Sequence, residues 1–135
     1  MKVIAFNACP AKESGYTAQI LAPFIEGIKN AGAEIEFFNI SDLDIKECRG
    51  CTDDDFFSYS DKCQCDDDMN SIYPKMREAD VWVFASPNNM TPKFKNLLDR
   101  MEPLYAPISE DFFNGNGSDN HKGSIVYVSA SNTNK

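Results

Sequence analysis

The stretch "KVIAFNACPAKESGYTAQIL", residues 2–21, decides how this chain folds. Residues 2–6 are apolar and partly β-branched, as in a buried strand, and from Tyr16 onward apolar residues recur at helical spacing. A short loop of small and hydroxylated residues joins the two patterns. A loop that opens a helix directly after a buried strand presents free backbone N–H groups at the positive end of the helix dipole. The stretch therefore predicts a strand–loop–helix unit whose turn suits a phosphate group.

Outward from this unit, the chain keeps alternating between strand and helix patterns. The expected elements are strands at 2–6, 34–40, 80–86 and 123–131 and helices at 16–31, 69–79 and 92–101. The glycine of "NAGAE" is expected to stop the first helix. This alternation predicts an α/β fold with a parallel sheet, covered on both faces by right-handed crossovers, in one domain over residues 1–135.

Composition limits the compartment and the partners. Hydrophobic residues make up 42% of the 135 residues, which is enough for a packed core. The formal net charge of -8 argues against nucleic acid and anionic lipid as partners, so an anionic ligand must be held by local backbone dipoles. No apolar run approaches the ~18 residues of a membrane span, and the N-terminus carries no signal-peptide pattern. We therefore expect a cytoplasmic protein.

Five residues of the first loop are candidate contacts for a phosphate: Lys12, Ser14, Gly15, Tyr16 and Thr17. The hydroxyl groups and Lys12 can donate to an anion, and Gly15 lets the backbone come close. An ordinary helix with Ser14 as its N-cap explains the same pattern equally well. Dinucleotide and Walker fingerprints are absent. A phosphatase-type nucleophile at the preceding cysteine is disfavoured, because Gly15 stands where low-molecular-weight phosphotyrosine phosphatases need an arginine.

Four segments of the chain resemble, in collinear order, the NADPH-dependent FMN reductase family. They are "MKVIAFNACPAKESGYTAQIL", "AGAEIEFFNISDLDIKECRGC", "DDDMNSIYPKMREADVWVFASP" and "MTPKFKNLLDRMEPL", within roughly residues 1–105. That family has a flavodoxin-like fold and includes the iron–sulfur flavoproteins. The resemblance implies a doubly wound parallel sheet that binds FMN and uses NAD(P)H. It also implies that Asp99 and Arg100, in the helix after the third strand, are structural or lie at a dimer contact.

By this resemblance, three loops would hold the FMN. The implied phosphate contacts are Cys9, Lys12, Ser14, Gly15, Tyr16 and Thr17; the implied ring contacts are Pro87, Asn88, Asn89 and Met90, with Ser131 and Asn132 after the last strand. Cys9 replaces the serine that the family usually has, and Ala11 replaces a basic residue. The loop after the third strand also lacks the tyrosine with which the family faces the flavin.

Two cysteine pairs follow the second strand, Cys48-x-x-Cys51 and Cys63-x-Cys65. Four thiolates suit a [4Fe–4S] cluster or tetrahedral zinc. Iron–sulfur flavoproteins carry their cluster motif in this segment, but Asp54 stands here in place of its third cysteine. Thiols without a metal are therefore the alternative. The neighbouring aspartates, including Asp66–Asp68 at the start of the next helix, are expected to be solvated.

The last strand pattern raises a question about the edge of the sheet. Residues 125–128 have the composition of a strand buried on both faces, yet the flavodoxin strand order places this strand near one side. A bare apolar edge strand invites aggregation. We expect either a chain that is truncated after its fourth strand or a partner that covers this edge, such as a second copy in a homo-oligomer.

One functional hypothesis and two alternatives follow. The first is an FMN-dependent enzyme that takes hydride from NAD(P)H and passes electrons to a flavin, a quinone or another small acceptor. The second is a non-enzymatic flavin or iron–sulfur electron carrier. The third is a flavodoxin-like remnant that binds no flavin.

Overall fold

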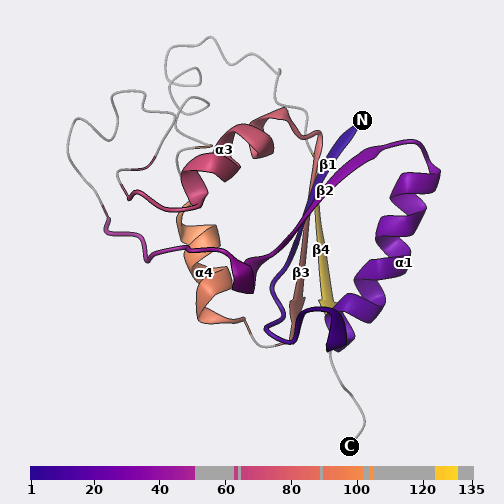
Figure 1. Ribbon diagram of the computed structural model, residues 1–135, viewed down its shortest axis with the longest axis horizontal. Helices are drawn as coiled ribbons and strands as arrows, with labels where there is room; N and C mark the ends of the chain where they lie inside the picture. The colour runs from indigo at the N-terminus through magenta and orange to yellow at the C-terminus, as the bar shows by residue number, and fades with distance from the viewer. Residues whose placement is uncertain (51–62, 64, 89, 102–103, 105–123, 131–135) are drawn as a thin grey trace, which may run out of the picture.

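Four parallel strands form the centre of the computed structural model, which describes residues 1–50, 63, 65–88, 90–101, 104 and 124–130 (Figure 1). The strands are β1 (Lys2–Asn7), β2 (Glu34–Asn39), β3 (Val81–Pro87) and β4 (Ser124–Ala130). They pair in the order β2-β1-β3-β4, and every pairing is parallel. The predicted flavodoxin-like α/β fold is confirmed, including the position of the last strand at one side of the sheet.

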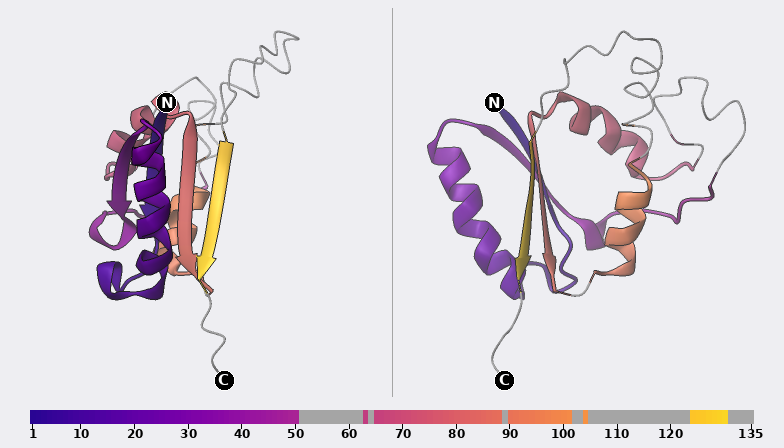
Figure 2. Two further views of the ribbon diagram at one scale, coloured as in Figure 1. Left: turned by 90° about the vertical axis from the view of Figure 1, so that its right-hand side faces the viewer. Right: turned by 180° about the vertical axis from the view of Figure 1, so that it is seen from behind.

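Helices cover both faces of the sheet, as the alternation predicted. They are α1 (Tyr16–Asn30), α3 (Met69–Glu78) and α4 (Pro92–Asp99), with short 3₁₀ turns η1 (Lys12–Ser14) and η2 (Ile40–Asp42). Helix α1 lies on one face, and α3 and α4 lie on the other (Figure 2). Gly32, with φ of 85°, follows the end of α1 and confirms the predicted glycine stop. Among the described residues, no helix is long and apolar enough to cross a membrane.

Alternating side chains of β1 and β3 divide the core into two parts. Phe6 and Phe84 point toward α3 and α4, where their rings stack with centroids 5.5 Å apart. Val3 and Val83 point toward α1 and pack in the same cluster as Leu21. Because side chains alternate along a strand, one apolar run supplies both parts of the core.

The composition of β4 is that of a strand buried on both faces, but the structure buries only one of them, as the expected edge position implies. Ile125 and Tyr127 are 61% and 54% exposed, whereas Val126 and Val128 pack into the core beneath α1. β4 lies at one edge of the sheet, and among the described residues only its face toward α1 packs into the core. The expected apolar edge therefore has one solvent-facing row.

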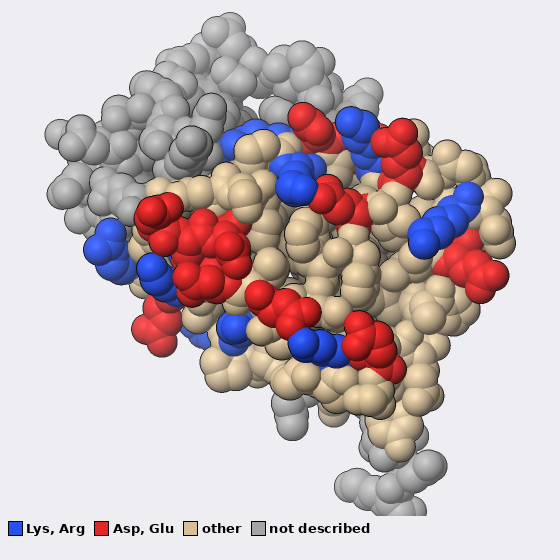
Figure 3. All heavy atoms as spheres, viewed as in Figure 1, with Lys and Arg blue, Asp and Glu red and all other residues tan. Residues whose placement is uncertain are grey.

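Charged side chains of opposite sign lie next to each other over much of the face drawn in Figure 3. Lys75 pairs with Glu36 of β2, and Lys2 pairs with Glu78 over 3.7 Å. Several acidic side chains of this face are thus paired with lysines. Exposed pairs of this kind contribute little to stability.

Candidate functional site

The loops after β1 and β3 lie against each other at the carboxyl edge of the sheet, at the lower end of Figure 1. The backbone N–H of Ala8 donates to the carbonyl of Ala85 over 2.8 Å. Thr91, the N-cap of α4, lies with its Oγ1 3.5 Å from the carbonyl oxygen of Ala8. In open parallel sheets this edge is where ligands bind, so the candidate site starts here.

The loop after β1 has the backbone geometry of an anion-binding concavity. Ala11 is in the right-handed helical region, with φ of -74° and ψ of -4°, and Lys12 follows with a positive φ of 50°. Right-handed followed by left-handed backbone turns successive N–H groups toward one point. The N–H groups of Ala11 and Glu13 have no hydrogen-bond partner among the described residues. We call this concavity, together with the start of α1, the anion cradle.

The start of α1 contributes further donors to the anion cradle. Gly15 is the N-cap of α1, and no side chain caps this end. The N–H groups of Tyr16, Thr17 and Ala18 find no acceptor in the described part of the chain. The alternative in which Ser14 caps the helix is wrong, because the Ser14 hydroxyl donates to the carbonyl of Ala11 over 2.7 Å. The helix start is therefore open to an external acceptor, which the helix dipole favours if it is anionic.

The thiol of Cys9 leaves no room for a side chain at position 15 unless the thiol or the loop moves. A Cβ at position 15 would lie 2.6 Å from Cys9 Sγ, far inside van der Waals contact. Cys9 is buried, with 8% of its surface exposed. Cys9 thus packs inside the loop, where it supports the backbone of the anion cradle.

The other predicted phosphate contacts differ in where their side chains lie. Lys12 forms an ion pair with Asp42 of η2, and the hydrogen bond and charge of Asp42 raise the pKa of Lys12 above its ordinary value. Its ammonium group is therefore held by Asp42. Thr17 is buried at the first turn of α1, and the Tyr16 side chain is 63% exposed. Direct contact of these side chains with a ligand stays a prediction.

The predicted ring-binding loop is described only in part. Pro87 is the last residue of β3. Asn88 and Met90 follow it and are exposed at the carboxyl edge of the sheet, where the anion cradle also lies. Just before them, the buried Ser86 hydroxyl lies 2.5 Å from the hydroxyl of Tyr127. The predicted contacts Asn89, Ser131 and Asn132 lie outside the described residues.

The cysteine pairs are likewise described in part. Cys48 is exposed, Cys63 is half-buried against the core beneath α3 and α4, and Cys65 is buried. The N–H of Gly50 donates to Cys48 Sγ over 3.4 Å. Cys51 lies outside the described residues. Among those described, no three cysteine, histidine or acidic side chains come together closely enough to hold a metal ion. The described thiols alone therefore do not fit a cluster or a zinc ion.

A buried ion pair joins Asp67 to Arg100, and the sequence did not predict it. Arg100 Nη1 lies 2.6 Å from one Asp67 oxygen and Nη2 lies 2.9 Å from the other, with both side chains fully buried. Burial alone would raise the pKa of Asp67, but hydrogen bonds from Arg100 and from the N–H groups of Lys46 and Met69 lower it below its ordinary value. The expectation that Asp66–Asp68 are all solvated is wrong for Asp67. Of the two alternatives expected for Asp99 and Arg100, a structural role or a dimer contact, the buried pair supports a structural role for Arg100.

Helix α4 fixes the segment that leads into the cysteines. Lys93 Nζ donates to the carbonyls of Ser41 (3.3 Å) and Leu43 (2.9 Å), Asn96 Nδ2 to Ile45 (3.3 Å) and Arg100 Nη1 to Lys46 (3.0 Å). Tyr73 donates to the carbonyl of Arg100 over 2.5 Å, and burial raises the pKa of Tyr73 to about 12. The donors of α4 share one face of the helix because they are three and four residues apart.

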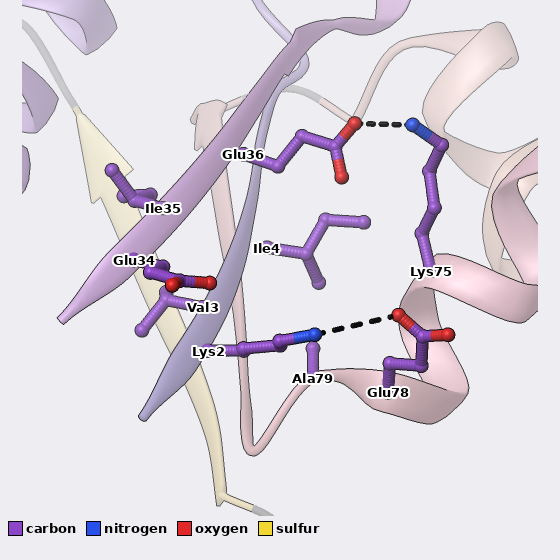
Figure 4. Close-up of a pocket in the computed structure, with 9 residues that line it drawn as sticks. All are labelled: Lys2, Val3, Ile4, Glu34, Ile35, Glu36, Lys75, Glu78 and Ala79. Carbon is purple, nitrogen blue, oxygen red and sulfur yellow. Dashed lines mark hydrogen bonds and ion pairs between the residues drawn. The ribbon is translucent and has the colours of Figure 1, made fainter.

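A hollow lies at the opposite edge of the sheet from the anion cradle. It has a volume of about 190 Å³ and lies between the amino ends of β1 and β2 and the end of α3 (Figure 4). Figure 4 shows the ion pairs Lys2–Glu78 and Lys75–Glu36 beside it, with Ile4 at its centre. This hollow contacts none of the predicted ligand-binding residues, so we do not assign the ligand to it.

The fold is flavodoxin-like, and the anion cradle lies between its first strand and first helix, at the carboxyl edge where open parallel sheets bind ligands. Residues 1–131 match the NADPH-dependent FMN reductase family, and the chain belongs to that family. The residues of the cradle fit the terminal phosphate of FMN, because partnerless N–H groups are the donors that such a phosphate needs.

Three iron–sulfur flavoproteins are similar to this chain in sequence. One from Archaeoglobus fulgidus is 38% identical over 103 residues, which are 74% of this chain and 48% of the relative. One from Methanocaldococcus jannaschii is 33% identical over 107 residues, 77% of this chain and 53% of the relative. One from Methanosarcina thermophila is 34% identical over 106 residues, 74% of this chain and 52% of the relative. The chain thus spans about half the length of these curated relatives.

Solved structures with the same fold are more distant in sequence. A flavone reductase has a TM-score of 0.64 at 20% identity, and the match covers 99% of this chain and 44% of that protein. The NAD(P)H:quinone oxidoreductase from Methanothermobacter marburgensis has a TM-score of 0.62 at 13% identity, and the match covers 98% of this chain and 84% of that protein. At these identities the likeness supports the fold alone.

Proposed function

We propose that this chain binds FMN through its terminal phosphate at the anion cradle and takes part in NAD(P)H-dependent oxidoreduction. The observation that carries the proposal is the set of backbone N–H groups at Ala11, Glu13 and the start of α1, which have no partner among the described residues. Membership of the FMN reductase family supports flavin as the ligand. When bound, FMN supplies hydride and electron transfer, with NAD(P)H as donor and a flavin, a quinone or another small molecule as acceptor.

In this proposal the protein binds and orients, and no side chain acts as an acid or base. The cradle holds the phosphate with fixed dipoles, which matters because the net charge of -8 repels anions at a distance. Gly15 lets the helix start approach the loop at Cys9. The exposed residues Asn88 and Met90 would border the ring, at the end of β3. The cradle therefore fixes the position of the ligand, and the loop after β3 fixes its orientation.

Two further expectations stay predictions within this proposal. The first is a cluster or zinc ion at the cysteine pairs, which iron and zinc analysis of the purified protein tests directly. The second is a partner over the edge strand, where Ile125 and Tyr127 are exposed. A second copy of the chain would cover this row in a homo-oligomer.

Flavin titration tests the proposal. The protein is added to FMN and, separately, to riboflavin, which lacks the phosphate, while flavin fluorescence is followed. We expect saturable quenching of FMN at micromolar protein and about tenfold weaker binding of riboflavin, because only FMN offers charge-assisted acceptors to the cradle. No saturable quenching of FMN would refute flavin binding. Oxidation of NADH or NADPH by the FMN-loaded protein, with a quinone as acceptor, then distinguishes an enzyme from an electron carrier.

A further inference from the structure

Two asparagines end the neighbouring strands β1 and β2 directly beneath the anion cradle. Asn7 and Asn39 are register partners in the parallel pair. Asn7 is buried, with 1% of its surface exposed, and its Oδ1 accepts the backbone N–H of Cys9 over 3.0 Å. Its Nδ2 donates to Asn39 Oδ1 over 3.2 Å, and Asn39 Nδ2 donates to Glu13 Oε1 over 3.3 Å. A continuous chain of hydrogen bonds thus runs from the sheet to the cradle.

The direction of this chain is dictated by its two ends. The Cys9 N–H can only donate, so Asn7 must turn its oxygen toward it. The amide nitrogen of Asn7 then faces Asn39, which must present its oxygen in turn. Asn39 is left with its nitrogen toward Glu13, whose carboxylate can only accept. One backbone N–H therefore sets the orientation of both amides and makes Asn39 a donor to Glu13.

The end of the chain bears on the charge at the cradle. Glu13 contributes one of the two partnerless N–H groups of the concavity, yet it also carries the only carboxylate within the described loop between β1 and α1. A free carboxylate there would repel a phosphate and compete for the same donors. The contact with Asn39 holds the Glu13 side chain toward β2. Lys12 is drawn to the β2 side as well, by Asp42 of η2.

We propose that Asn39 is a positioning residue for the anion cradle, holding the Glu13 carboxylate away from a bound phosphate, and that Asn7 sets the orientation of the Asn39 amide. This inference rests on the proposed function, because it concerns the same site. Asn39 touches no ligand itself. Its effect on binding passes through the charge of Glu13, and that dependence is what an experiment can isolate.

A double-substitution cycle with two flavins tests the role of Asn39. FMN and riboflavin affinities are measured by fluorescence quenching for the unmodified chain, Asn39→Ala, Glu13→Gln and the double variant. We expect Asn39→Ala to weaken FMN binding about fivefold, because the freed carboxylate lies near the phosphate, and to leave riboflavin binding unchanged. In the Glu13→Gln background, Asn39→Ala should change FMN binding by less than about twofold, since no charge is left to position. Asn30→Ala, at the exposed end of α1 remote from the cradle, is the matched control.

The outcomes separate the inference from the proposed function. An unmodified chain that shows no saturable quenching of FMN refutes both. A chain that binds FMN, but in which Asn39→Ala weakens FMN and riboflavin equally or acts undiminished in the Glu13→Gln background, refutes only the role of Asn39. Should Asn39→Ala lose its circular dichroism signal for folding, Asn39→Leu keeps the side-chain volume without the amide and takes its place. Glu13 is exposed, so Glu13→Gln is expected to fold normally.

Discussion

Substitution of Gly15 by alanine tests whether the Cys9 thiol shapes the anion cradle. The new Cβ would lie 2.6 Å from Cys9 Sγ and 3.3 Å from the Cβ of Ala11. The optimal separation of non-bonded heavy atoms is about 3.5–4.0 Å, so the new Cβ would overlap the sulfur by about 1 Å. Gly15 has φ of -86°, which alanine also adopts, so the cost arises from the overlap and not from the backbone. Overpacking of this kind costs about 1–3 kcal/mol of unfolding free energy.

The cause of that cost can be isolated by removing the sulfur. We expect Gly15→Ala alone to lower the urea midpoint, and Gly15→Ala in a Cys9→Ala background to cost at least about 1 kcal/mol less, because the overlap is gone. Gly27→Ala is the control: it makes the same change inside α1, where an added Cβ meets nothing within 4 Å. A mid-helix change of this type should stabilise the chain by about 0.5–1 kcal/mol.

Urea unfolding followed by circular dichroism measures all of these variants. The reasoning is refuted if Gly15→Ala is tolerated as well as Gly27→Ala. It is also refuted if the costs of Gly15→Ala and Cys9→Ala simply add in the double variant, since the thiol would then play no part. FMN quenching gives an independent readout on the same samples. A loop displaced by the clash should bind FMN more weakly, and Cys9→Ala should restore part of that loss.

Four further predictions concern the rest of the molecule. Arg100→Met leaves the buried Asp67 carboxylate without its partner and should lower the free energy of unfolding in urea by about 3–5 kcal/mol. The double variant that also carries Asp67→Leu should recover most of that loss. Because the folded pKa of Asp67 lies below its ordinary value of 3.8, its contribution is fully present above that value and is lost as pH falls through the folded pKa; acid unfolding with Asp67→Asn as comparison measures this. Ile125→Lys on the exposed row of β4 should reduce self-association in light scattering, and an unchanged mass would rule out this edge as the contact. FMN affinity should hold or tighten as salt is raised, because salt screens the repulsion from a net charge of -8; a steep loss with salt would instead place a mobile cation at the phosphate.

The sequence was sufficient to predict the fold because its apolar residues recur with two distinct periods. Ile72 and Met76, four residues apart, are both fully buried on α3, as a helical stripe requires. The continuous apolar run of β3 needs no alternation, because α1 and α4 cover opposite faces of that strand. An apolar pattern predicts burial correctly only where another helix or strand packs against that face. It failed at β4, where Ile125 and Tyr127 have the composition of core residues but lie at an edge.

The contacts around the site could not be predicted from the sequence because they join distant segments. Asp67 belongs to a run of three aspartates, and nothing local distinguishes it from its neighbours. Asp67 differs from its neighbours only because Arg100, 33 residues later at the end of α4, lies where it can pair with it. The pairing of Lys12 with Asp42 depends in the same way on how η2 passes the loop. The asparagines at 7 and 39 did carry a signal, since both are polar residues at the ends of strands, and such residues face the carboxyl edge of the sheet.

The departures of this loop from its family are consistent with a cradle whose main donors are backbone N–H groups. By sequence, Cys9 and Ala11 remove a hydroxyl and a positive charge from the phosphate site. In the structure, the Cys9 thiol packs against Gly15, Lys12 pairs with Asp42, and Glu13 turns to Asn39, so each side chain is held out of the cradle. What remains are N–H groups fixed by the loop and the helix. Donors that are already oriented lose little entropy when an anion binds, and they need no mobile cation to reach it. The loss of a basic residue at position 11 therefore does not argue against phosphate binding in this chain.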